Sequence, residues 1–282
     1  MRVIKDLKEM HSYSAKMKRR GKRIGFVPSM GYLHEGHLSL VEAARKKADV
    51  VVVSIFVNPT QFGPGEDLAR YPRDLTRDKK LLRNFEVDVL FLPEANKIYP
   101  KGYKTYVEVE GPSKIMCGRS RPTHFRGVTT VVAKFFNIVS PDYAFFGEKD
   151  FQQQVIIKRM VRDLNFPIEI ISLPIVREFD GLAMSSRNKY LIPSERSAAT
   201  ILYKALSFAK KEVENGERNS HKLLLKMRSL IEAEPAVKLD YLVMVHPETL
   251  EELKKIKGKG LIALAAFVGK ARLIDNLLVN AK

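Results

Sequence analysis

The sequence predicts an α/β fold, with a doubly wound, Rossmann-like parallel sheet followed by a smaller C-terminal α+β domain. Short apolar runs such as Val50 to Val57 have the length and β-branched composition of strands covered on both faces. Stretches with helical spacing separate these runs, and such alternation implies right-handed crossovers between parallel strands. After about residue 177 the order changes to helices followed by strands. These three observations determine the predicted fold class.

The first 176 residues are predicted to alternate between helices and strands. We predict helices at residues 3–20, 38–48, 66–85 with a break near Pro72, 128–139 and 150–164. We predict strands at residues 23–27, 50–57, 87–93, 106–109, 143–146 and 168–173, with a polar, basic loop at residues 111–127. Proline ends two of these strands, at Pro59 and Pro93.

The remaining residues, 177–282, are predicted to form the small α+β domain. Helical spacing covers residues 194–215 and 220–233, and strand patterns cover residues 239–245, 261–267 and 271–275. Val268-Gly269-Lys270 is a short hairpin signal between the last two strands. We therefore place the domain boundary between residues 176 and 177.

Composition predicts a globular protein of the cytoplasm. The chain of 282 residues is 45% hydrophobic, and it has no apolar run near the 18 residues of a membrane span. The first residues mix charges of both signs, unlike a signal peptide. Cys117 is the only cysteine, which excludes an internal disulfide and a cysteine zinc cage.

The formal net charge of +17 raises the possibility of a nucleic-acid partner. Lysine and arginine are scattered beside acidic residues, as in Arg77-Asp78-Lys79-Lys80, which favours solvated helix faces. Aromatic stacking motifs for RNA are absent from the sequence. We therefore expect small anionic substrates, with neither nucleic acid nor a membrane as partner.

His34 and His37 fall where a predicted strand gives way to a predicted helix. Their spacing of three residues places both rings on one side of a first helical turn. Three interpretations are open: half of a metal site, a structural helix cap, or a site where two imidazoles and the helix end hold phosphate groups. Gly36 leaves room for an anion, and together with the position at the corner it favours the phosphate site.

Three other segments end strands or follow the domain boundary. Gly147 to Asp150 joins a strand to a helix and offers the Lys149 charge to phosphate, although Asp150 can equally act as a helix N-cap. Met184 to Arg187 combines hydroxyl groups with a guanidinium, which suits an anion but is also common in turns. Gln61 follows the strongest strand and would project over its carboxyl end.

Taken together, these segments resemble pantothenate synthetases, also called pantoate–β-alanine ligases. The resemblance lies in residues 28–37, 58–62, 121–128, 146–150 and 181–188, which occur together and in order. The family belongs with the nucleotidyltransferases and class I aminoacyl-tRNA synthetases. Met184 to Arg187 resembles the counterpart of their Lys-Met-Ser-Lys-Ser loop, with Arg187 in the place of a lysine.

The resemblance implies a two-step, ATP-dependent ligation assisted by Mg²⁺. Pantoate would first form pantoyl adenylate with release of pyrophosphate, and the amine of β-alanine would then displace AMP. The family is also dimeric, so a homodimer is implied. A nucleotidyltransferase that leaves its nucleotide on the product and an RNA-binding protein are the alternatives.

The resemblance also assigns site residues and domain roles. It implies ATP binding by Met30, Gly31, Tyr32, Leu33, His34, Glu35, Gly36, His37, Gly147, Glu148, Lys149, Asp150, Val176, Met184, Ser185, Ser186 and Arg187. His37 would be the family's proton donor, and we expect His34, His37 and Lys149 to act on the phosphates.

Pantoate would bind Gln61 and Gln153, with Gln61 holding β-alanine later. Asp78 matches an acidic segment linked to Mg²⁺, although a helix-surface carboxylate is an equal interpretation. Residues 1–176 would bind ATP and pantoate, and residues 177–282 would act as a lid. The basic loop from Arg119 to Arg126 could gate the site, pair subunits or simply be solvated.

Overall fold

The computed structural model describes residues 1–281, which form two compact units. Unit 1 comprises residues 1–148 and 156–174, and unit 2 comprises residues 149–155 together with the chain from residue 175 onward. Residues 149–155 thus belong with unit 2 by their contacts, although they precede the predicted boundary. Each unit has its own core and is described by itself.

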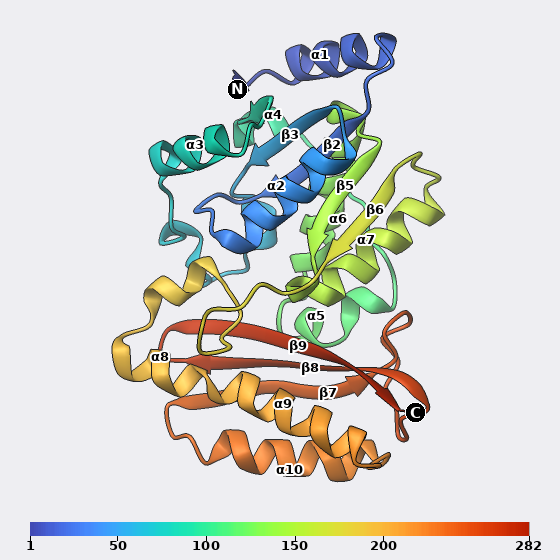
Figure 1. The fold of residues 1–282 in the computed structure, drawn as a ribbon. Helices are drawn as coiled ribbons and strands as arrows, with labels where there is room; N and C mark the ends of the chain where they lie inside the picture. The colour runs from blue at the N-terminus through green and yellow to red at the C-terminus, as the bar shows by residue number, and fades with distance from the viewer. Residues whose placement is uncertain (282) are drawn as a thin grey trace. The chain divides into compact units, whose positions relative to one another are not determined.

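Unit 1 is built on a six-stranded parallel sheet with the order β1-β4-β3-β2-β5-β6 (Figure 1). The strands are β1 (Arg2–Ile4), β2 (Ile24–Ser29), β3 (Val50–Ile55), β4 (Val89–Phe91), β5 (Tyr143–Gly147) and β6 (Glu169–Leu173). The predicted doubly wound sheet is confirmed. From β2 the chain builds outward through β3 and β4 on one side and through β5 and β6 on the other, so the strand order reverses between β2 and β5. Open α/β sheets bind ligands at the carboxyl ends of such strands.

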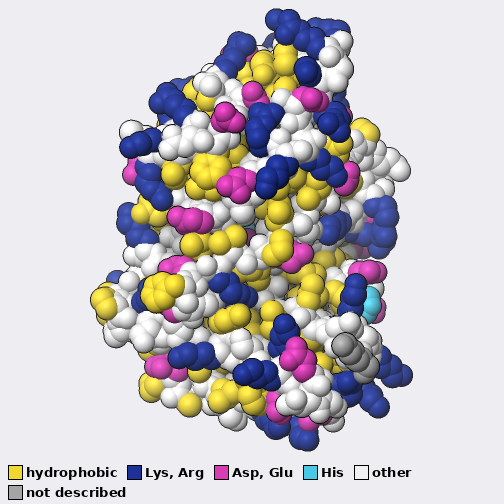
Figure 2. Space-filling view, in the orientation of Figure 1, with side chains coloured by type: hydrophobic (Ala, Val, Ile, Leu, Met, Phe, Trp, Pro, Cys, Tyr) yellow, Lys and Arg dark blue, Asp and Glu magenta, His cyan; other side chains and the backbone are white. Residues whose placement is uncertain are grey.

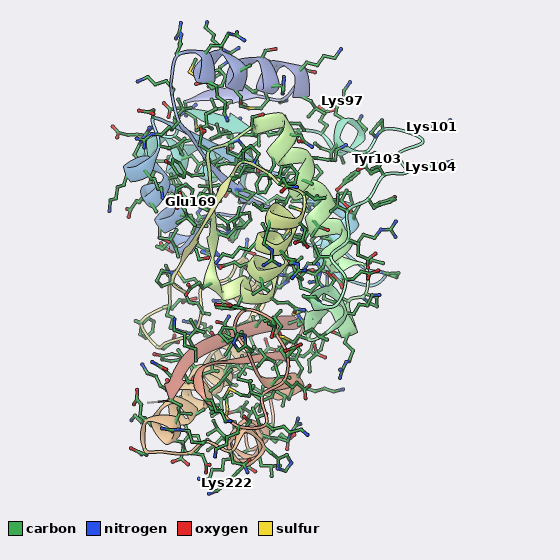
Figure 3. All side chains as sticks on the ribbon, turned by 90° about the vertical axis from the view of Figure 1, so that its right-hand side faces the viewer. Lys97, Lys101, Tyr103, Lys104, Glu169 and Lys222 are labelled. Carbon is green, nitrogen blue, oxygen red and sulfur yellow. The ribbon has the colours of Figure 1, made fainter. Side chains whose placement is uncertain are left out.

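Helices cover both faces of this sheet. The helices of this part of the chain are α1 (Leu7–Arg19), α2 (Glu35–Lys47), α3 (Leu75–Asn84), α4 (Ala95–Ile98), α5 (Cys117–Ser120), α6 (His124–Val139) and α7 (Phe151–Asp163), whose first residues belong to unit 2. Helices α2 and α6 lie on opposite faces (Figures 1 and 3). Phe135 of α6 packs edge-on against Phe26, Phe56 and Phe91 with ring centroids 5.8–6.0 Å apart. This aromatic cluster fixes α6 against the sheet.

Three expectations for unit 1 are wrong. The helix predicted at residues 3–20 begins only at Leu7, because Arg2–Ile4 pairs with β4 as an edge strand. Residues 106–109 form no strand, because the backbone of Val107 bonds to side chains of α6: its amide donates to Thr130 and its carbonyl accepts from Thr129. The predicted loop at residues 111–127 contains α5 and the first turn of α6.

Unit 2 contains an antiparallel sheet with helices on one face (Figure 1). Its strands are β7 (Val237–Val245), β8 (Gly258–Val268) and β9 (Ala271–Ala281), and its helices are α8 (Pro193–Ala199), α9 (Ile201–Glu214) and α10 (Ser220–Glu232). The predicted α+β arrangement is confirmed, and Gly269-Lys270 forms the turn between β8 and β9. Strand β9 is six residues longer than the predicted 271–275, and its core is shared with α9 and α10.

The positive charge of the chain is dispersed. Lysine and arginine side chains are spread over the face shown in Figure 2, with aspartate and glutamate among them. Several form ion pairs within a unit, such as Lys47 with Glu169 at 2.7 Å. Among residues 1–281, no helix combines the length and the apolar character needed to cross a membrane.

Candidate active site

The corner between β2 and α2 brings His34 and His37 side by side. The predicted strand-to-helix corner is confirmed, although β2 extends to Ser29, beyond the predicted end at residue 27, and α2 begins at Glu35, before the predicted start at residue 38. The two imidazole centroids are 4.1 Å apart, and both side chains are partly exposed. The corner follows the central strand β2, next to the end of β5, where the strand order reverses. The first turn of a helix also carries amide groups without partners inside the helix, which favours an anion here.

One hydrogen bond defines the protonation pattern of His37. The amide N–H of His34 donates to Nδ1 of His37 at 3.3 Å. Because an amide N–H can only donate, Nδ1 must accept, and the neutral His37 ring therefore carries its proton on Nε2. The His37 side chain thus presents an N–H donor opposite the nitrogen that is tied to the backbone. A donor of this kind can stabilise charge on a phosphate oxygen.

Helix α3 holds the loop that leads into this corner. The carboxylate of Asp78 accepts from the amide of Tyr32 and from the amide of Leu33, each at 2.8 Å. Arg77 donates to the carbonyl of Leu33 at 2.7 Å and lies over the Tyr32 ring. Gly31 and Tyr32 have φ angles of 85° and 51°, so the loop needs such support. Asp78 and Arg77 therefore fix the approach to His34.

Asp78 is almost completely buried, with 1% of its surface exposed. Burial raises the pKa of the Asp78 carboxyl above its ordinary value, against the lowering effect of the amides of Leu33 and Tyr32. Both oxygens are already used by backbone donors. No group of three or more His, Cys, Asp and Glu side chains is placed to hold a metal ion within residues 1–281. The residues present thus do not fit a protein-held Mg²⁺ at Asp78.

Gln61 lies in a short helical turn, residues Pro59–Gln61, that follows β3. Its carbonyl accepts from Arg121 at 3.0 Å and contacts Nδ1 of His124 at 3.0 Å. Arg121 is held in turn by Glu66, at 2.8 Å from its Nε. Although burial raises the pKa of Glu66, the hydrogen bond and charge of Arg121 hold that pKa below its ordinary value. The basic loop therefore positions the Gln61 backbone.

The close approach of α6 to this turn depends on a glycine. A Cβ on Gly127 would lie 2.4 Å from the carbonyl oxygen of Thr60, too close for any other residue. Asn58 bonds through its side-chain amide to the Gly127 carbonyl at 3.1 Å. The segment after β3 is thereby docked against the start of α6.

The corner after β5 is the second predicted phosphate segment. Gly147 ends β5, and Glu148 to Asp150 form one short helical turn before α7. A Cβ on Gly147 would meet nothing within 4 Å among residues 1–281, so this strand end is open. Gln153 lies in the first turn of α7 and is partly exposed. Asp150 precedes α7 directly, where an N-cap would lie.

The third predicted segment belongs to a hairpin in unit 2. The amide of Met184 donates to the carbonyl of Val176 at 3.0 Å, and Arg177 pairs with Ala183 across the hairpin. The hydroxyl of Ser185 accepts from the amide of Arg187 at 3.2 Å, which starts a short helical turn at residues 186–190. The structure therefore brings together Val176 and Met184, two residues that sequence reasoning assigned separately to the nucleotide.

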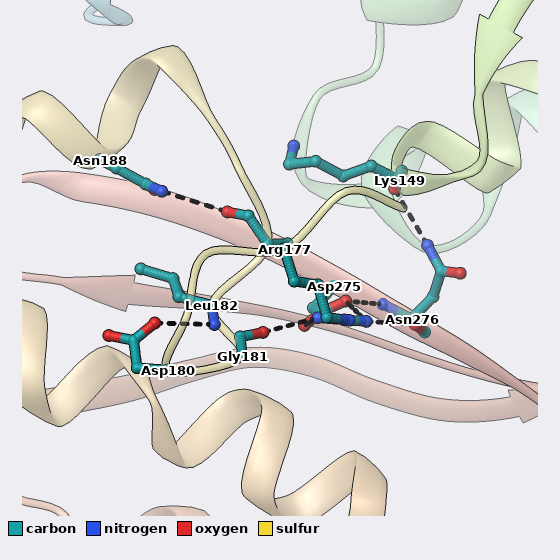
Figure 4. Close-up of polar contacts among 9 residues, drawn as sticks. Lys149, Arg177, Asp180, Gly181, Leu182, Asn188, Asp275 and Asn276 are labelled. Carbon is teal, nitrogen blue, oxygen red and sulfur yellow. Dashed lines mark hydrogen bonds and ion pairs between the residues drawn. The ribbon is translucent and has the colours of Figure 1, made fainter. Parts of the chain in front are cut away.

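Sequence reasoning missed the residues that hold these segments. Arg77 and Arg121 are arginines that patterning treats as solvated or as part of an unassigned basic loop, yet each binds a backbone carbonyl at the site. Asp275 and Asn276 interrupt an apolar strand, and that interruption is the one signal that pointed to them. Both are buried, and they bond to Arg177 and to the carbonyl of Lys149 in unit 2 (Figure 4).

Comparison with known proteins gives a consistent result. Residues 2–278 match the family model described as pantoate-beta-alanine ligase. The pantothenate synthetase of Moorella thermoacetica is 55% identical over 280 residues, covering 99% of both chains. That of Thermosipho melanesiensis is 56% identical over 280 residues, covering 99% of this chain and 100% of its own.

Solved structures agree. The crystal structure of pantothenate synthetase from Thermus thermophilus matches with a TM-score of 0.93 and 48% identity, covering 98% of this chain and 99% of that chain. The pantoate-beta-alanine ligase from Francisella tularensis, complexed with beta-gamma ATP and beta-alanine, matches with a TM-score of 0.80 and 38% identity, covering 99% and 97%. This chain therefore belongs to the pantoate-beta-alanine ligase family and catalyses the ATP-dependent condensation of pantoate with β-alanine.

Proposed function

We propose that this enzyme works in two steps through a pantoyl adenylate. A carboxylate oxygen of pantoate attacks the α-phosphorus of ATP, the bond to the bridging oxygen breaks, and pyrophosphate leaves. The amine of β-alanine then attacks the activated carbonyl, loses a proton, and AMP leaves with the oxygen that pantoate contributed. Positioning and charge neutralisation supply most of the catalysis in such transfers, and no covalent enzyme intermediate is needed.

The observation that carries this proposal is the imidazole pair at the start of α2. His37 presents an Nε2 donor, and the centroids of the His34 and His37 rings are 4.1 Å apart. Negative charge develops on the phosphate oxygens as pyrophosphate leaves, and donors already in place stabilise it without reorganisation. We assign His34 and His37 as phosphate ligands, with His37 also the source of a proton.

The remaining nucleotide contacts are proposed for three segments. The loop from Met30 to Leu33 and the helix start at Glu35 and Gly36 would surround the phosphates in unit 1. Gly147 and Glu148 follow β5, whose open strand end supports close approach of a ligand. Lys149 and Asp150, Val176, and Met184, Ser185, Ser186 and Arg187 are the contributions of unit 2. The lid role of residues 177–282 stays a prediction.

Gln61 and Gln153 are proposed to bind pantoate, and Gln61 to bind β-alanine afterwards. The fixed backbone of Gln61 supports this assignment, because a side chain on a rigid support loses less entropy on binding. We further propose that Mg²⁺ arrives as the complex with ATP, since this ion is commonly held by substrate phosphates and water. The enzyme is proposed to act in the cytoplasm as a homodimer, and the buried Cys117, which forms no disulfide, suits a reducing compartment.

Isotope exchange between ATP and pyrophosphate tests the two-step route. Exchange should require pantoate and should not require β-alanine, and AMP should appear only after β-alanine is added. Exchange supported by another acid and not by pantoate would contradict the proposal. His37→Ala should lower the exchange rate by about 10²–10³ with the fold retained. An exchange rate close to that of the unmodified enzyme would refute the role of His37.

A further inference from the structure

Two neighbouring residues in the middle of β9 bond to Arg177, in the hairpin that leads to the loop from Met184 to Arg187, and to Lys149 (Figure 4). Asp275 and Asn276 are 3% and 5% exposed. They pair with Leu264 and Ala263 of β8, well inside the sheet. Aspartate and asparagine are depleted from strands, and a polar pair buried in an apolar strand is a local conflict that folded proteins tend to keep at functional sites.

Asp275 forms a bidentate ion pair with Arg177. The distances are 2.7 Å from Nη1 to Oδ2 and 2.9 Å from Nη2 to Oδ1. Asp275 also accepts from the amide of Asn276 at 2.7 Å, and the Arg177 guanidinium lies 4.1 Å from the Tyr203 ring centroid. Buried ion pairs contribute little net stability compared with apolar packing, so their use here is better explained by a requirement for geometry.

Arg177 closes the hairpin that carries the predicted nucleotide loop. Its Nη1 donates to the carbonyl of Gly181 at 3.0 Å, and its backbone pairs with Ala183. Gly181 has a φ angle of 89°, and a Cβ there would lie 2.1 Å from the Tyr203 ring. The Arg177 guanidinium thus bonds across the turn of its own hairpin, to the carbonyl of Gly181. Met184 follows this turn directly, so the ion pair determines where the loop begins.

Asn276 holds the other segment. Its side-chain amide donates to the carbonyl of Lys149 at 3.0 Å. This bond fixes the backbone of Lys149 and does not involve its ammonium group, which lies at the other end of the side chain in Figure 4. All of these contacts lie within unit 2, which contains residues 149–155.

We infer that Asp275 and Asn276 are positioning residues for ATP, which hold Lys149 and the loop from Met184 to Arg187 in a common frame on β9. The inference rests on the proposed nucleotide role of these two segments. Neither residue touches the reacting atoms. Their effect is to remove the entropic cost of ordering two flexible segments when ATP binds.

The first test is Asn276→Ala, which removes the side-chain bond to the carbonyl of Lys149. In the pantoate-dependent exchange assay, the KM for ATP should rise about threefold to tenfold, the effect of one lost hydrogen bond, while the KM for pantoate stays unchanged. Asn280→Ala is the matched control, because Asn280 is exposed on the same strand. Equal KM values for ATP in the two variants, or an equal rise in the KM values for ATP and pantoate in Asn276→Ala, would overturn the inference.

The second test has a readout other than activity. Asp275→Asn keeps the shape and removes the charge that holds Arg177, so amide exchange of a peptide covering residues 176–188 should become about tenfold faster or more. Unchanged exchange in the folded variant would overturn the inference, and Asn276→Ala decides alone if Asp275→Asn does not fold. Lys149→Ala separates the two proposals. If Lys149→Ala leaves the KM for ATP unchanged, the assignment of Lys149 to the nucleotide fails. If Lys149→Ala raises the KM for ATP but Asn276→Ala does not, only the positioning role is overturned.

Discussion

Replacing Asp78 by alanine is the perturbation that most directly tests how the histidine corner is held. The change removes the acceptor of two backbone donors, the amides of Tyr32 and Leu33. The Leu33 amide is buried, and a buried donor without a partner costs about 1–3 kcal/mol. The Tyr32 amide is only partly buried, and its loss costs about 1 kcal/mol. We therefore expect Asp78→Ala to lower the free energy of unfolding by about 2–4 kcal/mol.

The same change should also slow catalysis, by an amount comparable in free energy to the loss of stability. The loop from Gly31 to Leu33 leads directly into His34, and Tyr32 is kept in a left-handed conformation that costs about 1–2 kcal/mol. Without its anchor the loop relaxes, and a displacement of about 1 Å at a catalytic group costs on the order of 10²-fold in rate. Asp78→Ala should lower pantoate-dependent exchange by about that factor. Asp78→Asn keeps one acceptor oxygen, so its exchange rate should lie between that of the unmodified enzyme and that of Asp78→Ala.

The assay combines urea unfolding with the exchange rate at saturating substrates. Asp74→Ala is the matched control, because Asp74 caps the same helix by accepting from the Arg77 amide at 2.9 Å but does not touch the loop. Loss of this cap costs about 0.5–2 kcal/mol in stability and should leave the exchange rate nearly unchanged. The reasoning is refuted if Asp78→Ala exchanges at the normal rate, or if Asp74→Ala loses as much activity.

Two further predictions concern carboxylates of the two units. Glu66→Gln should weaken the ion pair that holds Arg121 against the Gln61 carbonyl. Because bonds to charged groups contribute about 1.5–3 kcal/mol, the KM for pantoate should rise about tenfold. An unchanged KM for pantoate in steady-state kinetics would contradict this. The pKa of Glu217 is lowered from 4.5 to about 2, chiefly by the amide of Asn219, so its stabilisation is present above the unfolded value and is lost as pH falls toward 2. Glu217→Gln should therefore be less stable than the unmodified protein at pH 7, and urea midpoints should converge as pH falls from 4.5 to 2; a constant difference would be inconsistent.

The predictable part of the fold is the part dictated by local pattern. The buried run at β3 and the helical spacing of α2 gave the parallel sheet and placed His34 and His37 at a strand-to-helix corner, because periodicity and burial act over a few residues. The strand predicted at residues 106–109 failed for the same reason. An alternating pattern cannot show that the backbone of Val107 is bonded by threonines of α6, which lie more than twenty residues away.

The supporting residues of the site could not be predicted from pattern at all. Arg77 and Arg121 act through backbone carbonyls that are far away in sequence, and any solvated helix or loop contains arginines of the same kind. Asp78 is similar, since a carboxylate on an amphipathic helix is ordinarily exposed, and only the fold buries it under the Tyr32 loop. Local motifs therefore identify the candidate site residues, whereas contacts between residues far apart in the sequence hold those residues in place.

The fate of the carboxylate oxygen is the most direct test of the two-step route. Pantoate labelled with ¹⁸O in its carboxylate is converted with ATP and β-alanine, and the AMP, pyrophosphate and pantothenate are analysed by mass spectrometry. Attack on the α-phosphorus followed by amide formation predicts one ¹⁸O atom in every AMP and none in pyrophosphate. Unlabelled AMP, with ¹⁸O in a phosphate product or kept entirely in pantothenate and water, would contradict the pantoyl adenylate.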